Sequence, residues 1–138
     1  MIRAAPLLAA VAALLMAAPP AEARGCAGLV VRSTAASRMG DATLIWQQAR
    51  QPVSARNIGA VLDDGRWRLI WATPDAAERG VYFFRQAGKR GLRYADVWGG
   101  VIAPGDEAGV AKWARGLTSG GPDTRTVRCF IDMVKAGS

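Results

Sequence analysis

The chain of 138 residues contains no histidine. This absence excludes Ser-His-Asp and Cys-His catalysis, histidine metal sites and histidine-ligated haem. Catalysis near neutral pH would then need a carboxylate or a lysine with a strongly shifted pKa. The pair Gly99-Gly100 lacks the lysine-containing pattern of a phosphate-binding loop. We therefore expect no cofactor, and a protein that binds is favoured over one that converts a substrate.

Acidic residues and cysteines are also scarce. The 11 acidic residues are scattered, so no calcium-binding loop is visible and no metal site is predicted. The only two cysteines are Cys26 and Cys129, one near each end of the chain. In an exported protein two such cysteines are expected to pair, which leaves no thiolate for catalysis or zinc binding. Two separate buried thiols are the alternative.

The first residues have the three parts of an export signal. Arg3 is followed by an uncharged apolar run over 6–18, and Ala21 and Ala23 form a small-x-small cleavage pattern. The run is too short to span a bilayer, which takes about 20 apolar residues. We predict a signal peptide over 1–23 and a single small globular domain over 24–138, placed in the periplasm or outside the cell, with no transmembrane segment after cleavage. An uncleaved anchor is the alternative.

The net charge of +7 favours anionic partners. However, 15 of the 18 basic residues are arginine, and they are scattered without long runs. Abundant Arg, Ala and Gly is also what a GC-rich genome encodes, so the charge is interpreted mainly as a solvated surface. Together with the export signal, this disfavours nucleic acid as a partner.

Hydrophobic periodicity predicts an α+β domain. A short strand is expected over 26–32, a loop over 33–40 and a helix from Asp41 to Arg50. Alternation and turn signals predict an antiparallel meander of about four strands within roughly 57–98, with one helical turn over 73–80. Two C-terminal helices are expected, over 107–117 and after Asp123. A small mainly-β barrel is the alternative.

The candidate binding site lies on the last predicted strand. Tyr94, Asp96 and Trp98 alternate there and are expected to share a face. Aromatic rings stack on sugar C–H groups and a carboxylate accepts hydroxyl hydrogens, so this combination suits an envelope glycan. Trp98, beside two glycines, is the tryptophan expected to be exposed. The competing interpretation is a half-buried sheet face in which Asp96 pairs with an arginine of the next strand.

Two weaker patterns remain. Asp75 and Glu78 lie three residues apart in the predicted helical turn. They could form a catalytic carboxylate pair, or they could be ordinary charges at a helix end. A basic turn could bind a phosphate or an acidic glycan, or simply keep the loop soluble; it contains Arg85, Lys89, Arg90 and Arg93.

The sequence thus predicts an exported, non-enzymatic binding or accessory module for an envelope glycan or a protein partner, acting through Tyr94, Asp96 and Trp98. The first alternative is a carboxylate-dependent hydrolase of glycan or peptide, with Asp75, Glu78 and Asp96 as its only candidates. The second is a purely structural envelope domain without a ligand site.

Overall fold

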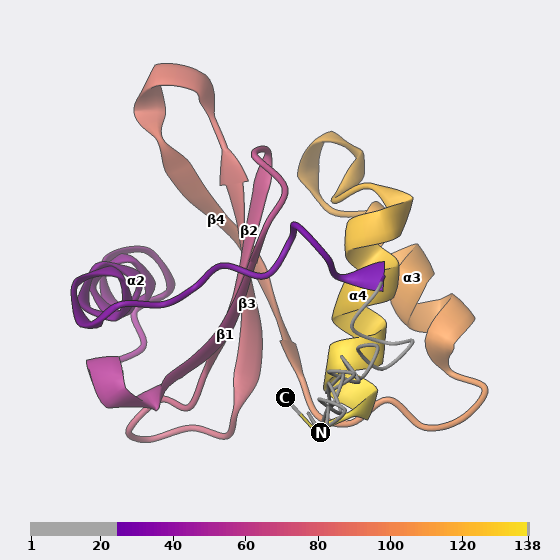
Figure 1. Cartoon of the computed structure of the whole chain (residues 1–138), viewed down its shortest axis with the longest axis horizontal. Coiled ribbons are helices and arrows are strands. Elements are labelled where there is room, and N and C mark those ends of the chain that lie inside the picture. The colour runs from indigo at the N-terminus through magenta and orange to yellow at the C-terminus, as the bar shows by residue number, and fades with distance from the viewer. Residues whose placement is uncertain (1–24, 138) are drawn as a thin grey trace, which may run out of the picture.

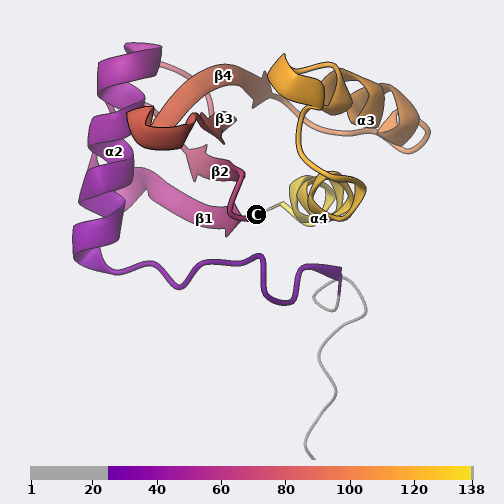
Figure 2. The ribbon, with the colours of Figure 1, turned by 90° about the horizontal axis from the view of Figure 1, so that it is seen from above.

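The computed structural model describes residues 25–137. The predicted signal peptide over 1–23 lies outside these residues. The described chain forms three layers, with a four-stranded sheet between one helix on one side and two helices on the other (Figures 1 and 2). No helix in this part of the chain combines the length and apolar character that crossing a bilayer requires.

The sheet is an antiparallel meander in the order β1-β2-β3-β4. Its strands are β1 (Ile58–Asp63), β2 (Trp67–Ala72), β3 (Gly80–Gln86) and β4 (Leu92–Gly99). The first turn forms because Asp64 Oδ1 accepts hydrogen bonds from the backbone N–H groups of Arg66 and Trp67, at 2.8 and 2.7 Å. The predicted α+β meander is confirmed, and the sheet is not closed into a barrel.

Helix α2 (Ala35–Ala49) begins six residues before the predicted start at Asp41. Its N-cap is Thr34, which forms a capping box with Ser37. The capping box satisfies backbone N–H groups that would otherwise lack partners, so the helix extends through the segment predicted as a loop. Asp41 is consequently an interior residue of the helix and is buried.

The C-terminal helices are α3 (Glu107–Arg115) and α4 (Thr124–Lys135), and the predicted N-cap Asp123 accepts a hydrogen bond from the Thr126 N–H at 2.7 Å. Short 3-10 helices are η1 (Ala55–Asn57), η2 (Gly88–Arg90) and η3 (Thr118–Gly120). Two local predictions are wrong. The segment 73–79 forms a turn without a helix, and the strand predicted over 26–32 is reduced to one bridge between Val30 and Leu62.

The sheet buries both of its faces. Trp67, Leu69 and Trp71 share one face, as alternation predicted, and pack in a cluster with residues of α3 and α4. The opposite face, with Ile70, packs against Ile45 of α2. This double burial explains why β2 is almost wholly buried, because each alternate set of side chains has a helical layer to cover it.

The predicted disulfide is present. Cys26 and Cys129 are joined, with 103 residues of sequence separation, and the bond ties the N-terminal segment to α4. Both cysteines are buried in the cluster under α3 and α4. Such a bond fits an oxidising, exported compartment.

An ion-pair network joins α2 to the sheet. Arg68 of β2 donates two hydrogen bonds of 2.9 Å to Asp41 and one of 3.0 Å to Asp63. Burial, the largest single influence, lowers the pKa of Arg68. The hydrogen bonds and charges of the two carboxylates outweigh burial, so the pKa lies above its usual value and the arginine stays ionised. The side chains of Asp41 and Arg68 are only 6% and 14% exposed.

The outer edges of the sheet are partly closed by other segments. At β4, the Gln48 side chain of α2 donates to the Leu92 carbonyl at 2.8 Å and accepts from the Tyr94 N–H at 2.7 Å. At β1, the N-terminal segment supplies two backbone hydrogen bonds of 2.9 Å, at Val61 and Asp63. These contacts occupy main-chain groups that would otherwise be open to another strand.

Candidate functional site

The three predicted site residues do not share one face of the sheet. The pairing of β3 with β4 shifts register between Phe83 and Phe84, where Phe83 lies opposite Asp96 and Phe84 lies opposite Tyr94. This irregularity inserts Ala95 as an extra residue and interrupts the alternation. Tyr94 therefore packs with the cluster facing α2, whereas Trp98 packs with the cluster facing α3 and α4. The predicted common face is wrong for this pair.

Tyr94 and Asp96 have local partners of their own. The ring of Tyr94 contacts Phe84 and Tyr82, with centroid distances of 5.7 and 6.4 Å. Burial raises the pKa of Tyr94, and the charge of Asp96 raises it further. Asp96 Oδ1 accepts a 2.8 Å hydrogen bond from the Val97 N–H. Asp96 therefore interacts with the edge of its own strand, and within residues 25–137 it forms no ion pair with a neighbouring arginine.

Trp98 is half-buried and does not stand out into solvent as predicted. Its ring packs on Trp113 at 5.2 Å and on Phe130 at 6.5 Å, so α3 and α4 cover most of it. The exposed tryptophan is Trp46 on α2, with half of its surface accessible. Sequence alternation places a side chain on a face, but it does not show how far a helix from elsewhere in the chain covers that face.

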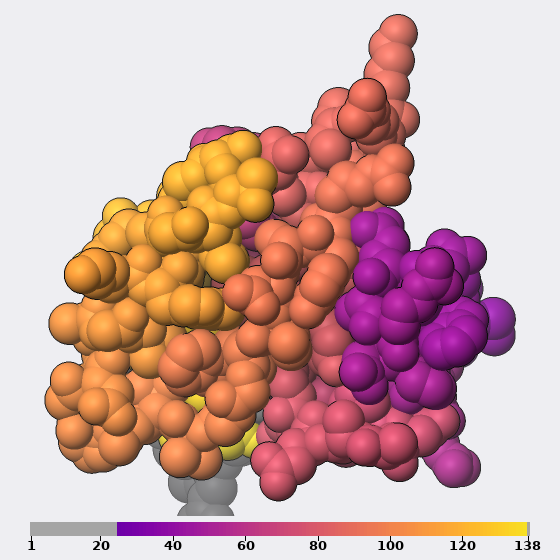
Figure 3. Space-filling model, turned by 180° about the vertical axis from the view of Figure 1, so that it is seen from behind, coloured from indigo at the N-terminus to yellow at the C-terminus, as the bar shows by residue number. Residues whose placement is uncertain are grey.

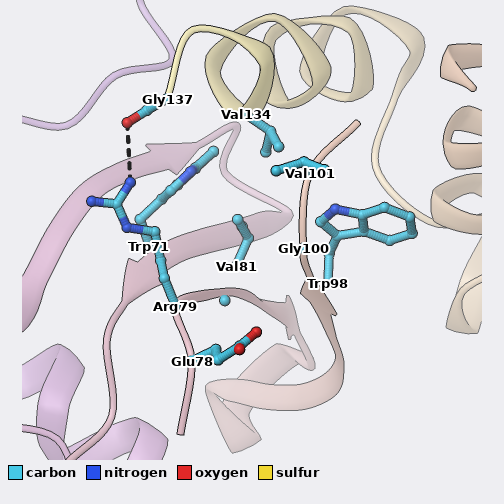
Figure 4. A pocket seen from close by; sticks show the side chains of 10 residues that line it. Trp71, Glu78, Arg79, Val81, Trp98, Gly100, Val101, Val134 and Gly137 are labelled. Carbon is cyan, nitrogen blue, oxygen red and sulfur yellow. Dashed lines mark hydrogen bonds between the residues drawn. The ribbon is translucent and has the colours of Figure 1, made fainter. Parts of the chain in front are cut away.

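Trp98 nevertheless borders a hollow of about 340 Å³ at one end of the sheet, which we call the tryptophan hollow (Figure 4). Its apolar wall comes from strands β2, β3 and β4 and from α4. Its rim carries one carboxylate and one guanidinium. Its lining includes the side chains of Trp71, Glu78, Arg79, Val81, Trp98 and Val134.

Two of these side chains carry unpartnered hydrogen-bond donors. The indole N–H groups of Trp71 and Trp98 are both buried, and no protein atom in the described part of the chain accepts a hydrogen bond from either. A buried N–H without an acceptor costs about 1–3 kcal/mol. Both residues line the tryptophan hollow, but the two nitrogen atoms have almost no accessible surface, so a ring would have to shift before its N–H met an oxygen atom of a molecule seated there. A third unpartnered indole, that of Trp67, does not line the hollow.

The rim is built by the loop between β2 and β3. Arg79 donates a 3.0 Å hydrogen bond to the Gly137 carbonyl, which links the loop to the end of α4 (Figure 4). Gly80 follows at the start of β3 because a Cβ there would lie 2.9 Å from the Val97 side chain. Glu78 is exposed beside Arg79, and its carboxylate forms no ion pair within residues 25–137. Nothing in the local sequence indicates that this loop, α4 and two tryptophans meet.

The carboxylates named as hydrolase candidates do not gather in one hollow. Glu78 lines the tryptophan hollow, Asp75 lines a separate groove beside α2, and Asp96 bonds its own strand. A different carboxylate, Glu107, lines a third groove between α3 and α4. A hydrogen bond from Lys135 lowers the pKa of Glu107 to about 2, so Glu107 is ionised near neutrality and cannot donate a proton there.

The basic turn contains η2 and projects from the body of the molecule between β3 and β4 (Figures 1 and 3). Lys89 and Arg90 are exposed at its tip. Neither side chain borders the tryptophan hollow, the groove beside α2 or the groove between α3 and α4. Within residues 25–137, no group of three or more Asp, Glu or Cys side chains is placed to hold a metal ion.

Comparison with known proteins gives no relative. No family model matches the chain, and neither a curated protein nor a solved structure resembles it significantly.

Proposed function

We propose that this chain is an exported, non-enzymatic binding module that holds an uncharged, sugar-sized ligand in the tryptophan hollow. The observation that carries the proposal is a pair of tryptophans, Trp71 and Trp98, that line one hollow and whose buried indole N–H groups have no hydrogen-bond acceptor in the described part of the chain. The proposed ligand is a part of an envelope glycan, as expected from the sequence. Of the three residues predicted to bind it, only Trp98 belongs to the tryptophan hollow. Tyr94 lies on the other side of the sheet, and Asp96 is absent from the hollow, so neither is part of it.

The size of the hollow supports a small ligand. Ligand pockets are typically about 300–1,000 Å³. At about 340 Å³ the tryptophan hollow is near the lower limit, which suits one ring of a glycan better than an extended peptide.

The chemistry of the lining supports a hydroxylated ligand. Trp71, Trp98 and Arg79 offer donors, whereas the Glu78 carboxylate can only accept. A hydroxyl group both donates and accepts, so neighbouring hydroxyls on one ring could satisfy this mixed set. The carboxylate of Glu78 disfavours an anionic ligand, and Val81 and Val134 provide apolar surface for the C–H groups of a ring.

The five tryptophans allow a direct test, because each indole N–H gives its own signal in an NMR spectrum of ¹⁵N-labelled protein. Disulfide-bonded protein would be titrated with neutral mono- to tetrasaccharides. We expect the indole signals of Trp71 and Trp98 to shift together, with those of Trp46 and Trp67 unchanged. Absence of any shift at millimolar sugar, or shifts confined to Trp46, would refute the proposal.

A matched pair of variants tests the rim. Glu78→Gln and Asp75→Asn each remove one negative charge from the same loop, but only Glu78 lines the tryptophan hollow. A hydrogen bond to a charged group contributes about 1.5–3 kcal/mol, so Glu78→Gln should weaken sugar binding at least about tenfold. Asp75→Asn should leave it unchanged. Equal effects of the two substitutions would show that charge, and not the hollow, governs binding.

A further inference from the structure

A second hollow, of about 250 Å³, lies where β1 begins and β2 ends, and we call it the arginine notch. It shares Trp71 and Arg79 with the tryptophan hollow, but Glu78 does not line it. Its lining comes from η1 and the start of β1, from the end of β2, and from the loop before β3. The polar side chains that line it are those of Arg56, Asn57, Thr73 and Arg79.

The charged side chains that line the arginine notch are both positive. Arg56 belongs to η1 and Arg79 to the loop between β2 and β3, so the two cations come from segments well separated in the sequence. Both are exposed, and neither forms an ion pair within residues 25–137. No carboxylate among these residues lines the notch. Two cations beside one hollow repel each other, whereas an anion seated there is attracted to both.

One of the two arginines is held in place by the fold. Arg79 donates its 3.0 Å hydrogen bond to the Gly137 carbonyl through Nη1, and the other N–H groups of the guanidinium have no acceptor within residues 25–137 (Figure 4). A guanidinium presents its donors in a planar fork that matches the oxygen atoms of an oxyanion. Thr73 adds a hydroxyl and Asn57 a side-chain amide, and both groups can donate. Donors from three segments are therefore available to one small group.

The sheet is irregular beside the notch. The pairing of β1 with β2 shifts register between Ile58 and Val61, where β1 has one residue more than β2. Gly59 lies in this irregular stretch and lines the notch, and a Cβ on it would lie 3.3 Å from the Trp71 Cβ. Bulges are frequent beside functional sites, where they redirect side chains. This bulge follows directly after Arg56 and Asn57 in the chain.

The size of the notch and the spread of its donors favour a phosphate group. Ligand pockets are typically about 300–1,000 Å³, so a hollow of about 250 Å³ suits one anionic group better than a whole ligand. The two oxygen atoms of a carboxylate lie in one plane. The terminal oxygen atoms of a phosphate point in several directions, so a phosphate is better placed to accept from several segments at once.

We propose that the arginine notch binds a phosphate group, with Arg56 and Arg79 as its charged donors and Asn57 and Thr73 as its neutral ones. This site goes beyond the sugar-binding proposal and does not depend on it, because phosphate alone can occupy the notch. Free inorganic phosphate and a phosphate ester on a larger envelope molecule present the same chemistry, so both are tested.

NMR titration of ¹⁵N-labelled, disulfide-bonded protein with sodium phosphate tests the notch, with sodium chloride at equal ionic strength as the reference. We expect phosphate, and not chloride, to shift the backbone N–H signals of Asn57, Gly59 and Thr73. The indole signal of Trp98, which does not line the notch, should stay unchanged, so the outcome is separate from that of the sugar titration. Tighter binding of glycerol 3-phosphate than of inorganic phosphate would identify an ester as the natural ligand, and the opposite order would identify the free ion.

Three variants that each remove one positive charge complete the test. Arg56→Gln and Arg79→Gln should each weaken phosphate binding at least about tenfold, the loss expected for one charge-assisted hydrogen bond. Arg66→Gln is the matched control and should leave binding unchanged, because Arg66 is an exposed arginine outside the notch. Circular dichroism checks the fold of each variant, and Arg56→Gln leaves the bond between Arg79 and Gly137 intact.

The proposal is overturned by any of three results. The first is that millimolar phosphate shifts no signal of the notch. The second is that chloride shifts these signals as far as phosphate does. The third is that Arg66→Gln weakens binding as much as Arg56→Gln, which would mean that phosphate responds only to the net positive charge of the chain.

Discussion

Replacing Arg68 by methionine should destabilise the domain far more than removing either of its acidic partners. Within residues 25–137, Arg68 is the only cation that pairs with the buried Asp41, and it holds that carboxylate through two hydrogen bonds. Arg68→Met keeps most of the side-chain volume but leaves Asp41 buried without a positive partner. Breaking a buried pair in this way costs about 3–5 kcal/mol, a large share of the about 5–15 kcal/mol that stabilises a typical domain.

Removing the acidic partner, in Asp41→Asn, should lower the free energy of unfolding less than Arg68→Met does. In Asp41→Asn the arginine keeps its 3.0 Å bond to Asp63, which is more exposed, and the asparagine can still accept a hydrogen bond. We therefore expect Arg68→Met to be the most destabilising single change. The double variant Asp41→Asn/Arg68→Met should be more stable than Arg68→Met alone, because the second substitution removes the unpaired charge.

Urea unfolding followed by tryptophan fluorescence measures all four proteins, including the parent. The reasoning is refuted if Asp41→Asn costs as much as Arg68→Met, or if the two single effects simply add in the double variant.

Three further outcomes are expected. Replacing Cys26 and Cys129 by alanine should lower the free energy of unfolding by up to about 5 kcal/mol, because the bond closes a loop of 103 residues, and urea unfolding of both forms measures this. Gly121→Ala should lower the melting temperature markedly, since its Cβ would lie 1.9 Å from the Ala114 carbonyl oxygen and its φ is +69°; a melting temperature within a degree of the parent contradicts this. Hydrogen bonds from helix-terminal backbone N–H groups lower the pKa of Asp123, so its stabilisation is present above the unfolded pKa of about 4 and is lost as the pH falls through the folded value. Asp123→Ala should thus cost about 1 kcal/mol at pH 7 and less in acid, as seen in unfolding curves at pH 7 and pH 3.

The parts of the fold that depend on short-range signals are predictable from the sequence. Asp123 caps α4 as expected, since a cap bonds a backbone group only three residues away. The alternation of Trp67, Leu69 and Trp71 places one face of β2 correctly, because side chains in an unbroken strand must alternate. The start of α2 escapes prediction because Ser37 completes its capping box, where Glu or Gln is the usual signal.

The candidate site is less predictable, because it depends on the register shift between β3 and β4 and on contacts between segments far apart in the sequence. The register shift at Ala95 moves Tyr94 to the other face of the sheet, and a bulge leaves no mark in hydrophobic alternation. Sequence spacing pairs Glu78 with Asp75, yet the two carboxylates border different hollows. The contact of Glu78's loop with α4 spans 58 residues between Arg79 and Gly137, a distance over which a single sequence carries no pairing signal.

The bond between Cys26 and Cys129 also determines what a protease can do to this protein. All four strands, α2 and α3 lie inside the covalent ring that it closes. A single cut in any loop of that ring, including the projecting turn before β4, opens the ring but releases no fragment. The two new ends stay attached to one body and can remain folded together, so in a compartment rich in proteases the nicked molecule keeps its mass until a second cut or a reductant frees a piece.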